Sequence, residues 1–391
     1  MSLSEELAAT ALDSARRLVS DVLQPLKQAF VGKDEVIDLL GVSLVGGEHL
    51  FILGPPGTAK SAIVRELARR IEGRVFDYLL TRFTEPNELF GPFDIRKLRE
   101  GELVTNTEGM LPEASFVFLD ELLNANSAIL NSLLMVLNER VFRRGRETRK
   151  LPLLMVVGAS NRLPEDESLG ALFDRFLLRV RCDNVSQELL PNVLDAGWQL
   201  ELAETAVETL LNVDDVRRIQ RLLSQVDLAA IRAAYVDLIH RLKHAGIEIS
   251  DRRAVKLQRL IAASAVLCGR LHSEISDLWV LRYIWEKEEQ QEVLRSIVQD
   301  TIERAKPEES SRHPRSRKSE IPDPERLAAD LDRIAERLQQ PDLQATERTC
   351  LQDQTSLLAA RVEWVAEEQA RGFLKTKLEA VWKQLQDAPR Q

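Results

Sequence analysis

The residues best suited to chemistry lie in one short run, Gly54-Pro55-Pro56-Gly57-Thr58-Ala59-Lys60-Ser61. The spacing from its first glycine to the closing lysine and serine is that of a phosphate-binding P-loop. An apolar run over residues 50–53 precedes it as a predicted strand, and a helical pattern over residues 62–71 follows it. The backbone N–H groups at the start of that helix would face phosphate oxygens. These flanks disfavour the alternative, a glycine-proline turn with a chance lysine.

Two side chains of the loop have predicted roles, and one residue departs from the usual pattern. Lys60 would neutralise the oxygens of the β- and γ-phosphates, and Ser61 would bind Mg²⁺. The residue before the lysine is usually glycine, but here it is Ala59. Because alanine disfavours a positive φ, we expect Ala59 to have an ordinary helical φ where the loop turns into the helix.

A pair of acidic residues, Asp120 and Glu121, ends another apolar run that predicts a strand, Phe116-Val117-Phe118-Leu119-Asp120-Glu121. Carboxylates are rarely placed at the end of a buried strand without a partner. Beside a P-loop, Asp120 would hold Mg²⁺ through its water shell. Glu121 would orient and deprotonate an attacking water. The position of the pair after a P-loop favours these roles over a chance pair of acids.

Three further polar residues have positions that suit a nucleotide site. Asn161 follows an apolar run at residues 153–158 and could hydrogen-bond the attacking water or the γ-phosphate, although asparagine there is often a turn residue. Arg175 is either a surface charge or an arginine that reaches a neighbouring subunit's nucleotide. Arg252 begins a helix and would suit a sensor that reports the γ-phosphate to a helical lid, unless it is an ordinary first-turn charge.

The apolar pattern around these residues predicts an α/β core followed by helices. Residues 4–30 have the period of a helix, and residues 49–158 alternate apolar runs with helical stretches, as a largely parallel sheet covered on both faces would. The strand pattern stops after Asp183, and residues 186–305 form consecutive amphipathic helices. A chain of 391 residues is expected to hold two or three domains.

Composition disfavours several classes of protein. The formal net charge of −9 argues against a generally nucleic-acid-binding surface. The three cysteines, Cys182, Cys268 and Cys350, are far apart, which disfavours a disulfide framework or a zinc site and fits a reducing cytoplasm. The N-terminus has no signal-peptide pattern, and no apolar run approaches the ~18 residues of a membrane helix. We therefore expect a cytoplasmic protein without membrane insertion.

The C-terminal part of the chain has a different pattern. Residues 306–323 mix proline, serine and both signs of charge, which predicts a flexible linker. Residues 324–391 are helical again. Their heptad-like apolar seam comprises Leu327, Leu331, Ile334, Leu338, Leu374, Leu378, Val381 and Leu385. We expect an antiparallel helical hairpin that either packs on its own chain or serves as a docking arm for a partner.

Together these features resemble an AAA+ ATPase, and within that superfamily the MoxR family and its RavA-like group. The matching stretches are Val31–Ile37, GEHLFILGPPGTAKS, FVFLDELLNANSAILNSLLMVLNER, GASN, LFDRF and LRYIWEKEEQQEVLRSIVQ. The Ala-Lys ending of the P-loop also matches that group. The resemblance covers about residues 15–305 and does not reach the C-terminal segment. The expected organisation is an AAA+ core with a central parallel sheet at 1–185, an all-α lid with following helices at 186–305, a linker at 306–323 and a helical hairpin at 324–391.

The resemblance implies a role for each matching residue. The Walker A residues would be Lys60 and Ser61, and the Walker B residues Asp120 and Glu121. Asn161 matches sensor 1, Arg175 matches an arginine finger that acts in trans, and Arg252 matches sensor 2, with Arg253 as the competing choice. The nucleotide would also be contacted by Val31, Gly32, Gly54, Pro55, Pro56, Gly57, Thr58 and Ala59.

Proteins similar to this one assemble as hexameric rings and use ATP and Mg²⁺ to remodel or activate protein partners, commonly ones with a von Willebrand factor A domain. Three alternatives are a nucleic-acid-stimulated AAA+ motor, a nucleotide-dependent scaffold and the motor subunit of a magnesium chelatase. The overall acidity argues against the first, and Glu121 argues against a scaffold that barely hydrolyses ATP. The sequence does not reveal a metal-inserting partner, which would distinguish the third.

Two inserts in the core could project toward a pore or a partner. Residues 98–105 could form the pore-facing hairpin of this family. Residues 140–150 carry six basic residues against one acid, Glu147, and predict a second hairpin with Gly145 at its turn. The arginines of the second hairpin could contact a pore substrate or a partner. Alternatively they are solvated, or they face an acidic neighbour at a subunit interface.

Overall fold

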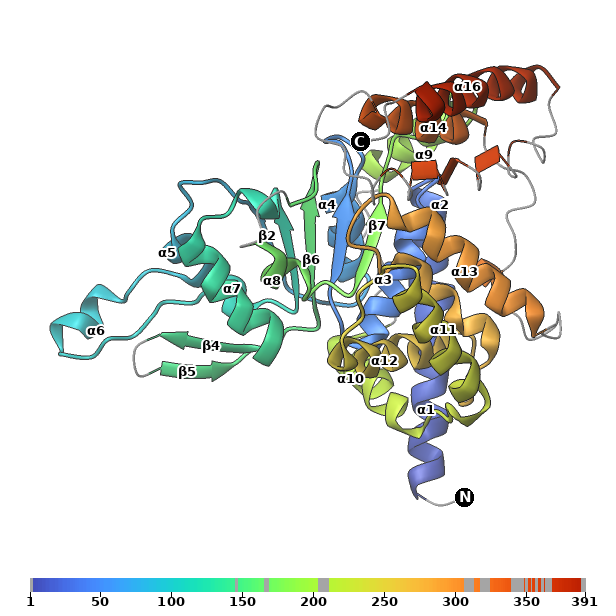
Figure 1. Ribbon diagram of the computed structural model, residues 1–391. Coiled ribbons are helices and arrows are strands. Elements are labelled where there is room, and N and C mark those ends of the chain that lie inside the picture. The colour runs from blue at the N-terminus through green and yellow to red at the C-terminus, as the bar shows by residue number, and fades with distance from the viewer. Residues whose placement is uncertain are drawn as a thin grey trace.

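The protein is described by a computed structural model (Figure 1). The described residues are 3–144, 147–164, 169–202, 211–305, 313–316, 324–338, 348, 351–352, 354–355, 358–359, 362 and 368–387. None of the helices in these ranges is both long and apolar enough to cross a lipid bilayer.

A five-stranded sheet forms the centre of the core. Its strands are β1 (Leu50–Leu53), β2 (Val75–Leu79), β3 (Phe116–Asp120), β6 (Met155–Ser160) and β7 (Leu178–Arg181). They lie in the order β2-β3-β6-β1-β7, and every neighbouring pair is parallel. The predicted parallel sheet is therefore confirmed. β1 has its predicted bounds, whereas β6 begins and ends two residues later than expected.

Two of the strands were not predicted, and their burial explains why. β2, VFDYL, is mostly half-exposed because it forms one edge of the sheet, so it lacks a continuous apolar run. β7, LRVR, alternates apolar residues with arginines. One of those arginines, Arg179, is nevertheless fully buried. Both patterns differ from the apolar run expected of a strand covered on both faces.

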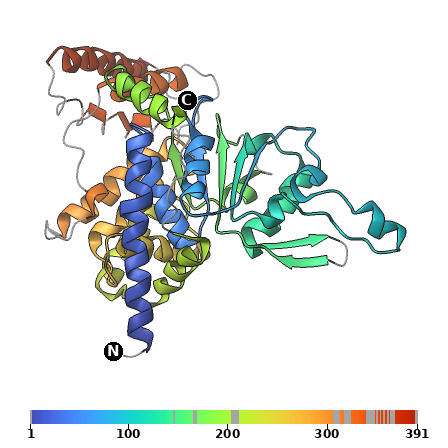
Figure 2. The same ribbon diagram turned by 180° about the vertical axis from the view of Figure 1, so that it is seen from behind.

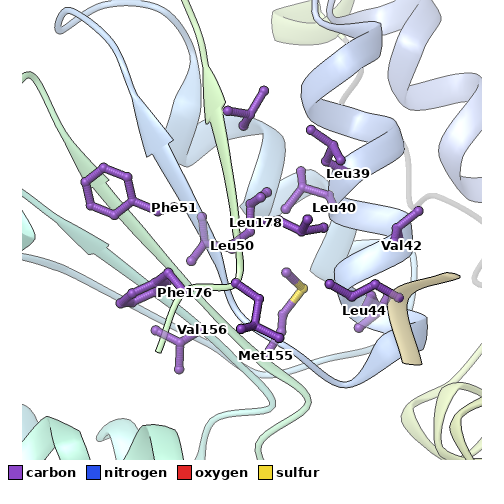
Figure 3. Packing of buried hydrophobic residues seen from close by; sticks show 14 of the residues in the cluster. Leu39, Leu40, Val42, Leu44, Leu50, Phe51, Met155, Val156, Phe176 and Leu178 are labelled. Carbon is purple, nitrogen blue, oxygen red and sulfur yellow. The ribbon is translucent and has the colours of Figure 1, made fainter. Parts of the chain in front are cut away.

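Helices cover the sheet, and one of them is buried along most of its length. α3 (Asp34–Gly46) is buried from Leu39 to Gly46, because the sheet lies on one side of it and the later helices on the other. Figure 3 shows its leucines packed against residues of β1, β6 and β7. Sheet-flanking helices include α4 (Lys60–Arg69), α7 (Ser127–Glu139) and the short α8 (Gly170–Phe173).

The N-terminal segment is helical throughout, as predicted. α1 (Leu3–Arg17), a π-helical turn η1 (Leu18–Leu23) and α2 (Gln24–Ala29) follow one another without a break. The π-helical turn lies just before Pro25, whose missing N–H interrupts the regular α-helical hydrogen-bond ladder.

The part of the chain after β7 is helical, also as predicted. It comprises η5 (Gln187–Leu189), α9 (Leu190–Leu202), α10 (Val213–Leu222), η6 (Leu223–Gln225), η7 (Ala229–Ile231), α11 (Arg232–His244), α12 (Asp251–Leu267), η8 (Ile275–Tyr283) and α13 (Gln290–Arg304). α12 packs on α3, where a Cβ on Gly46 would come within 2.8 Å of Leu260. In Figure 1, α10 and α12 lie near the end of the sheet opposite the arrowheads of the strands.

Two inserts project from the β2 side of the core, as Figures 1 and 2 show. The first carries α5 (Pro86–Phe90), α6 (Ile95–Arg99) and η2 (Leu111–Glu113). The prediction of a hairpin at residues 98–105 is wrong. Asp94 caps the start of α6, which continues to Arg99, and a single bridge joins Phe93 to Thr105. The second insert is the predicted hairpin, formed by β4 (Val141–Arg144) and β5 (Glu147–Lys150). Its expected turn residue, Gly145, lies outside the described residues.

The C-terminal helices have a hydrophobic core of their own. α14 (Pro324–Leu338) packs on α16 (Glu368–Asp387), and every residue of the predicted seam belongs to this second cluster. Residues Leu351, Leu358 and Val362 complete it. We call the described residues from 324 to 387 the C-terminal bundle.

Four residues of the expected flexible linker are packed on the body of the protein. His313 stacks on Trp279 with ring centroids 4.7 Å apart, and Ser316 is fully buried. Arg315 binds Asp38 of α3 at 2.5 Å. The prediction of flexibility is therefore wrong for residues 313–316, because two ring systems and an ion pair hold them. The rest of the expected linker lies outside the described residues.

Candidate functional site

The P-loop lies between β1 and α4, and steric constraints require glycine at two of its positions. A Cβ on Gly54 would lie 2.2 Å from the carbonyl oxygen of Cys182, which follows β7. Gly57 has φ +82°, a conformation that favours glycine. The loop can therefore lie against the end of β7 while it turns out of the sheet.

The prediction of a helical φ at Ala59 is wrong. Ala59 has φ +64° and is the N-cap of α4. A left-handed conformation costs a non-glycine residue about 1–2 kcal/mol. The loop accepts this cost because the chain must reverse direction within a few residues to start α4. Strain of this kind is concentrated at functional sites.

Lys60 folds over the loop that precedes it. Its ammonium donates hydrogen bonds to the carbonyl oxygens of Gly54 at 3.0 Å and Pro55 at 2.8 Å. The hydroxyl of Thr58 donates to the same Pro55 carbonyl at 3.0 Å, which stabilises the turn. Ser61 is half-buried in the first turn of α4. The lysine charge is thus held beside the loop backbone, where a phosphate would be bound.

The two predicted carboxylates lie where β3 ends. Asp120 is the last residue of the strand, and Glu121 follows it with φ +49°. The backbone N–H of Glu121 donates to the Asp120 carboxylate at 3.0 Å. Burial and the neighbouring Asp120 charge raise the pKa of Glu121, while the charges of Lys60 and Arg162 lower it. Glu121 is therefore within electrostatic reach of the P-loop lysine, and its raised pKa suits a general base.

Asn161 directly follows β6, which lies between β3 and β1. Its side chain is exposed at the edge where the P-loop and the carboxylate pair also lie. Since the strands are parallel, the predicted Walker A, Walker B and sensor 1 residues all follow carboxyl ends of neighbouring strands. The structure thus brings these residues to one edge of the sheet.

Arg162 belongs to this edge, and the sequence reasoning missed it. Its guanidinium donates to the side chain of Asn124 at 3.4 Å, and its charge lowers the pKa of Glu121. Asn124 lies in η3 (Leu122–Asn124), immediately after Glu121. The available signal was the position of Arg162 directly after Asn161, the residue that follows the strand.

The Val31–Gly32 segment lies against the chain that follows β7. The Lys33 ammonium donates to the carbonyl oxygen of Asp183. Gly32 has φ +74°, and a Cβ there would lie 2.9 Å from Val185. Because β7 neighbours β1, this packing places the segment on the P-loop side of the sheet. Contact of Val31 and Gly32 with an adenine stays a prediction.

The oxygen atoms available near the P-loop fit Mg²⁺. This ion binds through one or two protein oxygens together with waters and phosphate oxygens. Ser61 and Asp120 supply a hydroxyl and a carboxylate of that kind. In the described ranges, no group of three or more His, Cys, Asp or Glu side chains could hold a metal without such help. The residues present therefore suit an ion that arrives with a nucleotide.

Arg175 and Arg252 lie away from this edge. Arg175 lies shortly before β7, which begins at Leu178. The ring centroid of its neighbour Phe176 is 6.1 Å from that of His49, which precedes β1. Arg252 donates to Asn138 at 3.4 Å, near the end of α7. α7 begins close to the carboxylate pair and its 13 residues span about 20 Å. Both arginines are therefore near the amino ends of the strands, opposite the P-loop.

This placement limits the predicted sensor role of Arg252, which stays a prediction. An arginine side chain cannot cross the length of α7, so Arg252 cannot contact a phosphate at its own P-loop in this arrangement. The competing Arg253 is buried and donates to Glu286 and to the carbonyl of Ile284. Arg253 is thus occupied in joining α12 to the segment after η8. Arg175 is bonded to Asp174 at 3.0 Å, with about a fifth of its side chain exposed (22%).

The basic hairpin uses most of its arginines internally. Arg144 donates to Gly91 at 2.7 Å and lies 3.9 Å from the ring centroid of Phe93. Arg149 donates to Thr107 at 2.9 Å, and Arg140 donates to Gly47 at 2.6 Å. Arg143 pairs with Glu139. Arg140, Arg144 and Arg149 thus hold the two inserts and the core together, which disfavours a nucleic-acid-tracking role for these three residues.

Comparisons with known proteins agree with this architecture. Residues 16–221 match the family model of the MoxR domain in the MoxR-vWA-beta-propeller ternary systems, and residues 227–298 match an AAA lid domain. A crystal structure of a predicted ATPase from Cytophaga hutchinsonii superposes with a TM-score of 0.61 at 19% identity, over 77% of this chain and 96% of that one, which shows the shared fold.

Sequence relatives point to the same family. An uncharacterized protein of Methanocaldococcus jannaschii is 38% identical over 273 residues, 69% of this chain and 72% of that protein. The chaperone MoxR1 of Mycobacterium tuberculosis is 26% identical over 201 residues, 50% of this chain and 52% of that protein. The finer RavA-like assignment stays a prediction, because the matching family model is named for a different system. The chain belongs to the MoxR family of AAA+ ATPases.

Proposed function

We propose that this chain hydrolyses ATP and uses the reaction to remodel or activate a protein partner. The observation that carries the proposal is the convergence of Lys60, Asp120, Glu121 and Asn161 at the carboxyl edge of one parallel sheet. Glu121 lies within electrostatic reach of both the P-loop lysine and Arg162. A phosphate on the P-loop would therefore lie close to a carboxylate able to accept a proton from water.

Each residue of this edge has a defined task in the proposed reaction. The N–H groups at the start of α4 bind phosphate oxygens, and Lys60 exchanges its loop carbonyls for the β- and γ-phosphates. Glu121 orients the attacking water and takes its proton, while Asn161 holds the water or the γ-phosphate. Ser61 and Asp120 would hold Mg²⁺, which neutralises negative charge on the phosphates when it is bound.

The second half of the proposed site comes from another copy of the chain. Arg175 is too far from its own P-loop, so we infer that it acts on the nucleotide of a neighbouring subunit. Arg252 lies at the same edge, so any nucleotide that it contacts would belong to a neighbouring subunit. The resemblance of this chain to its family implies a hexameric ring. In such a ring, one subunit's amino edge would face the next subunit's carboxyl edge. Assembly would then control hydrolysis.

A protein with a von Willebrand factor A domain is the partner we propose. The family model that matches this chain is named for systems that pair a MoxR domain with such a protein and a β-propeller. The internal bonding of the basic hairpin disfavours nucleic acid as the partner. A chelatase-type motor subunit stays an alternative, which a metal-inserting partner would reveal. We expect the protein to work in the cytoplasm.

Two variants test the proposed hydrolysis. Lys60→Ala should abolish detectable ATP binding, because it removes the charge that neutralises the phosphates. Glu121→Gln should retain ATP but lower hydrolysis about 100- to 10,000-fold, the usual contribution of a general base. Lys150→Ala, at an exposed position of the hairpin, serves as the control and should behave as wild type. Phosphate release and binding of a fluorescent ATP analogue are measured in parallel. Wild-type hydrolysis by Glu121→Gln would show that the base is assigned wrongly.

A further inference from the structure

The segment that ends β7 touches the nucleotide site with two successive residues. Cys182 donates its S–H to the carbonyl of Thr58 at 3.4 Å, and its own carbonyl oxygen lies where a side chain on Gly54 would have to be. The next carbonyl, that of Asp183, accepts from Lys33 beside the Val31–Gly32 segment. The end of β7 therefore contacts both the P-loop and the Val31–Gly32 segment, and its position helps to set theirs.

The residue before them, Arg181, leads away from the site. It pairs with Leu53 in the sheet register, one residue before the P-loop begins. Its guanidinium donates to the Glu288 carboxylate at 2.8 Å and to its neighbour Asp183 at 3.2 Å. Burial lowers the pKa of Arg181, but the carboxylates of Asp183 and Glu288 outweigh burial and raise it, so Arg181 stays charged. Glu288 thus holds the end of β7 from outside the core.

Glu288 also holds the C-terminal bundle. The same carboxylate oxygen accepts from Arg333 of α14 at 3.2 Å, and Arg333 is oriented by Asp330 at 2.9 Å. The adjacent carbonyl of Glu289 accepts from Gln354 of the bundle. One short segment between η8 and α13 is therefore bonded both to the P-loop side of the sheet and to the bundle.

This segment is itself firmly fixed to the core. The buried Arg179 donates to the carbonyls of Ile284 at 3.1 Å and Trp285 at 2.7 Å. The side chain of Gln290 accepts from the N–H of Glu286 at 2.7 Å. Because the core holds the backbone of this segment, a movement of Glu288 involves its side chain and the residues bonded to it. The segment itself does not move to compensate.

The bundle itself is attached by polar contacts around a cavity. Its apolar residues form a cluster separate from that of the main core. Between the two lies a cavity of about 620 Å³ lined by Arg181, Glu288, Arg333 and, from the chain just after Asn161, Leu163 and Pro164. An interface of ion pairs around a cavity is weaker than a continuous apolar core. Such an attachment would allow the bundle to detach while the rest of the fold stays intact.

We propose that the C-terminal bundle is a docking module that sets the affinity of the P-loop for ATP, with Glu288 and Arg181 as positioning residues. Docking fixes Glu288 through Arg333 and so holds Arg181, Cys182 and Asp183 in the conformation that packs against the P-loop. Detachment releases this restraint and weakens nucleotide binding. By thermodynamic linkage, bound ATP must favour the docked bundle by the same factor. This inference rests on the proposed binding of ATP.

The test uses the full chain and three variants. Arg333→Ala removes the bond from the bundle side, far from the nucleotide, and Glu288→Gln removes the shared carboxylate charge. Asp332→Asn is the matched control, since this neighbour of Arg333 pairs with Lys377 inside the bundle. Affinity is measured with a fluorescent ATP analogue and Mg²⁺. Docking is measured by amide hydrogen exchange in α14, with and without the nucleotide.

We expect Arg333→Ala and Glu288→Gln each to weaken nucleotide binding about fivefold or more, the lower end of typical coupling between sites. Their effects should not add, because they break one connection. The nucleotide should slow exchange in α14 of the wild type by a similar factor but not in Arg333→Ala, which a merely stabilising role would not produce. Asp332→Asn should resemble the wild type.

Two results would overturn the inference. One is unchanged or tighter nucleotide binding in Arg333→Ala when exchange shows that α14 has been released. If α14 remains protected in that variant, Arg333→Glu, which opposes Glu288 with a like charge, is measured by the same criterion. The other is weakened nucleotide binding in Glu288→Gln but not in Arg333→Ala. That result would show that Glu288 acts on the nucleotide site through Arg181 without the bundle. A wild type that binds no ATP would instead contradict the proposed function itself.

Discussion

Both ends of the central sheet carry titratable side chains, but the partners of these side chains differ between the two ends. At the carboxyl edge, the charges of Lys60 and Arg162 each act on Glu121, which lies beside the P-loop. At the amino edge, His49 and Arg140 are taken up by backbone groups. Left-handed residues occur at both edges, at Ala59 and Glu121 of the first and at Arg140 of the second. The edges differ in their side chains: the first gathers charged groups beside the P-loop, whereas His49 and Arg140 of the second are bonded to backbone atoms.

Two arginines of the amino edge do not fit that description. Arg252 is exposed, and Arg175 keeps a buried Nε atom without a hydrogen-bond partner in the described structure. Neither can reach the P-loop of its own chain. This difference between the edges supports the proposal that one subunit's amino edge completes the carboxyl edge of another.

The largest effect should come from Arg175→Ala. An arginine finger supplied in trans contributes roughly 10³- to 10⁵-fold in hydrolysis rate. We expect hydrolysis to fall by at least the lower figure while the affinity for ATP stays within about twofold of wild type. Phosphate release and nucleotide binding are measured at a protein concentration where assembly is complete. Arg143→Ala, in the exposed pair with Glu139, is the control. Lost nucleotide affinity would place Arg175 at its own P-loop and remove the contrast between the edges.

A smaller effect concerns the rigidity of the amino edge. Burial and the Arg140 charge lower the pKa of His49 to about 3, although the hydrogen bond to the Leu137 carbonyl raises it. The Nδ1 atom accepts from the N–H of Val156, which requires this nitrogen to be unprotonated. The unfolded chain binds a proton near pH 6.5. The stability from neutral His49 is therefore complete above about pH 6.5. It is lost at about 1.4 kcal/mol per pH unit as the pH falls toward the folded pKa.

The prediction for His49 is a loss of about 2 kcal/mol between pH 7 and pH 5, measured by denaturant unfolding. His49→Gln should lose that much less over the same range, whatever its stability at pH 7. His313, whose pKa is also lowered to about 4, titrates in both proteins and cancels in the comparison. Equal pH dependence of the two proteins would show that the imidazole is not held neutral.

The smallest effect tests the strain of the carboxyl edge. Ala59→Gly should stabilise the fold by about 0.5–1 kcal/mol, because glycine avoids the left-handed penalty of roughly 1–2 kcal/mol but loses more backbone entropy. Urea unfolding at pH 7 measures the change. A helical φ at this position would reverse the sign, since glycine would then destabilise the helix start. The direction alone decides between the two conformations.

The carboxyl edge could be predicted almost completely from the sequence, because its parts are local. A P-loop, a strand that ends in two acids and a strand followed by Asn161 are each read within a few residues, and parallel pairing brings strand ends together. The φ of Ala59 was missed because it depends on how the loop packs against Cys182. Arg162 was missed because its relation to Glu121 exists only after the strands pair.

The amino edge and the C-terminal part could not be predicted in the same way. The sequence identifies Arg252 as the start of a helix, but only the packing of α12 on α3 places that helix at the far end of the sheet. Similarly, residues 313–316 have linker composition, yet Trp279 and Asp38 hold them through contacts distant in the chain. The helical seam of the C-terminal bundle was predicted because heptad spacing is again local.

The most direct test of the two-edge site mixes two inactive proteins, Arg175→Ala and Glu121→Gln. In a mixed assembly, some interfaces combine an intact Glu121 from one subunit with an intact Arg175 from the next. We predict that hydrolysis recovers on mixing to a substantial fraction of the wild-type rate, although each variant alone is nearly inactive. Formation of mixed assemblies is verified by labelling the two proteins with different fluorophores. No recovery where mixed assemblies form would contradict the proposal that the two edges of different subunits make one site.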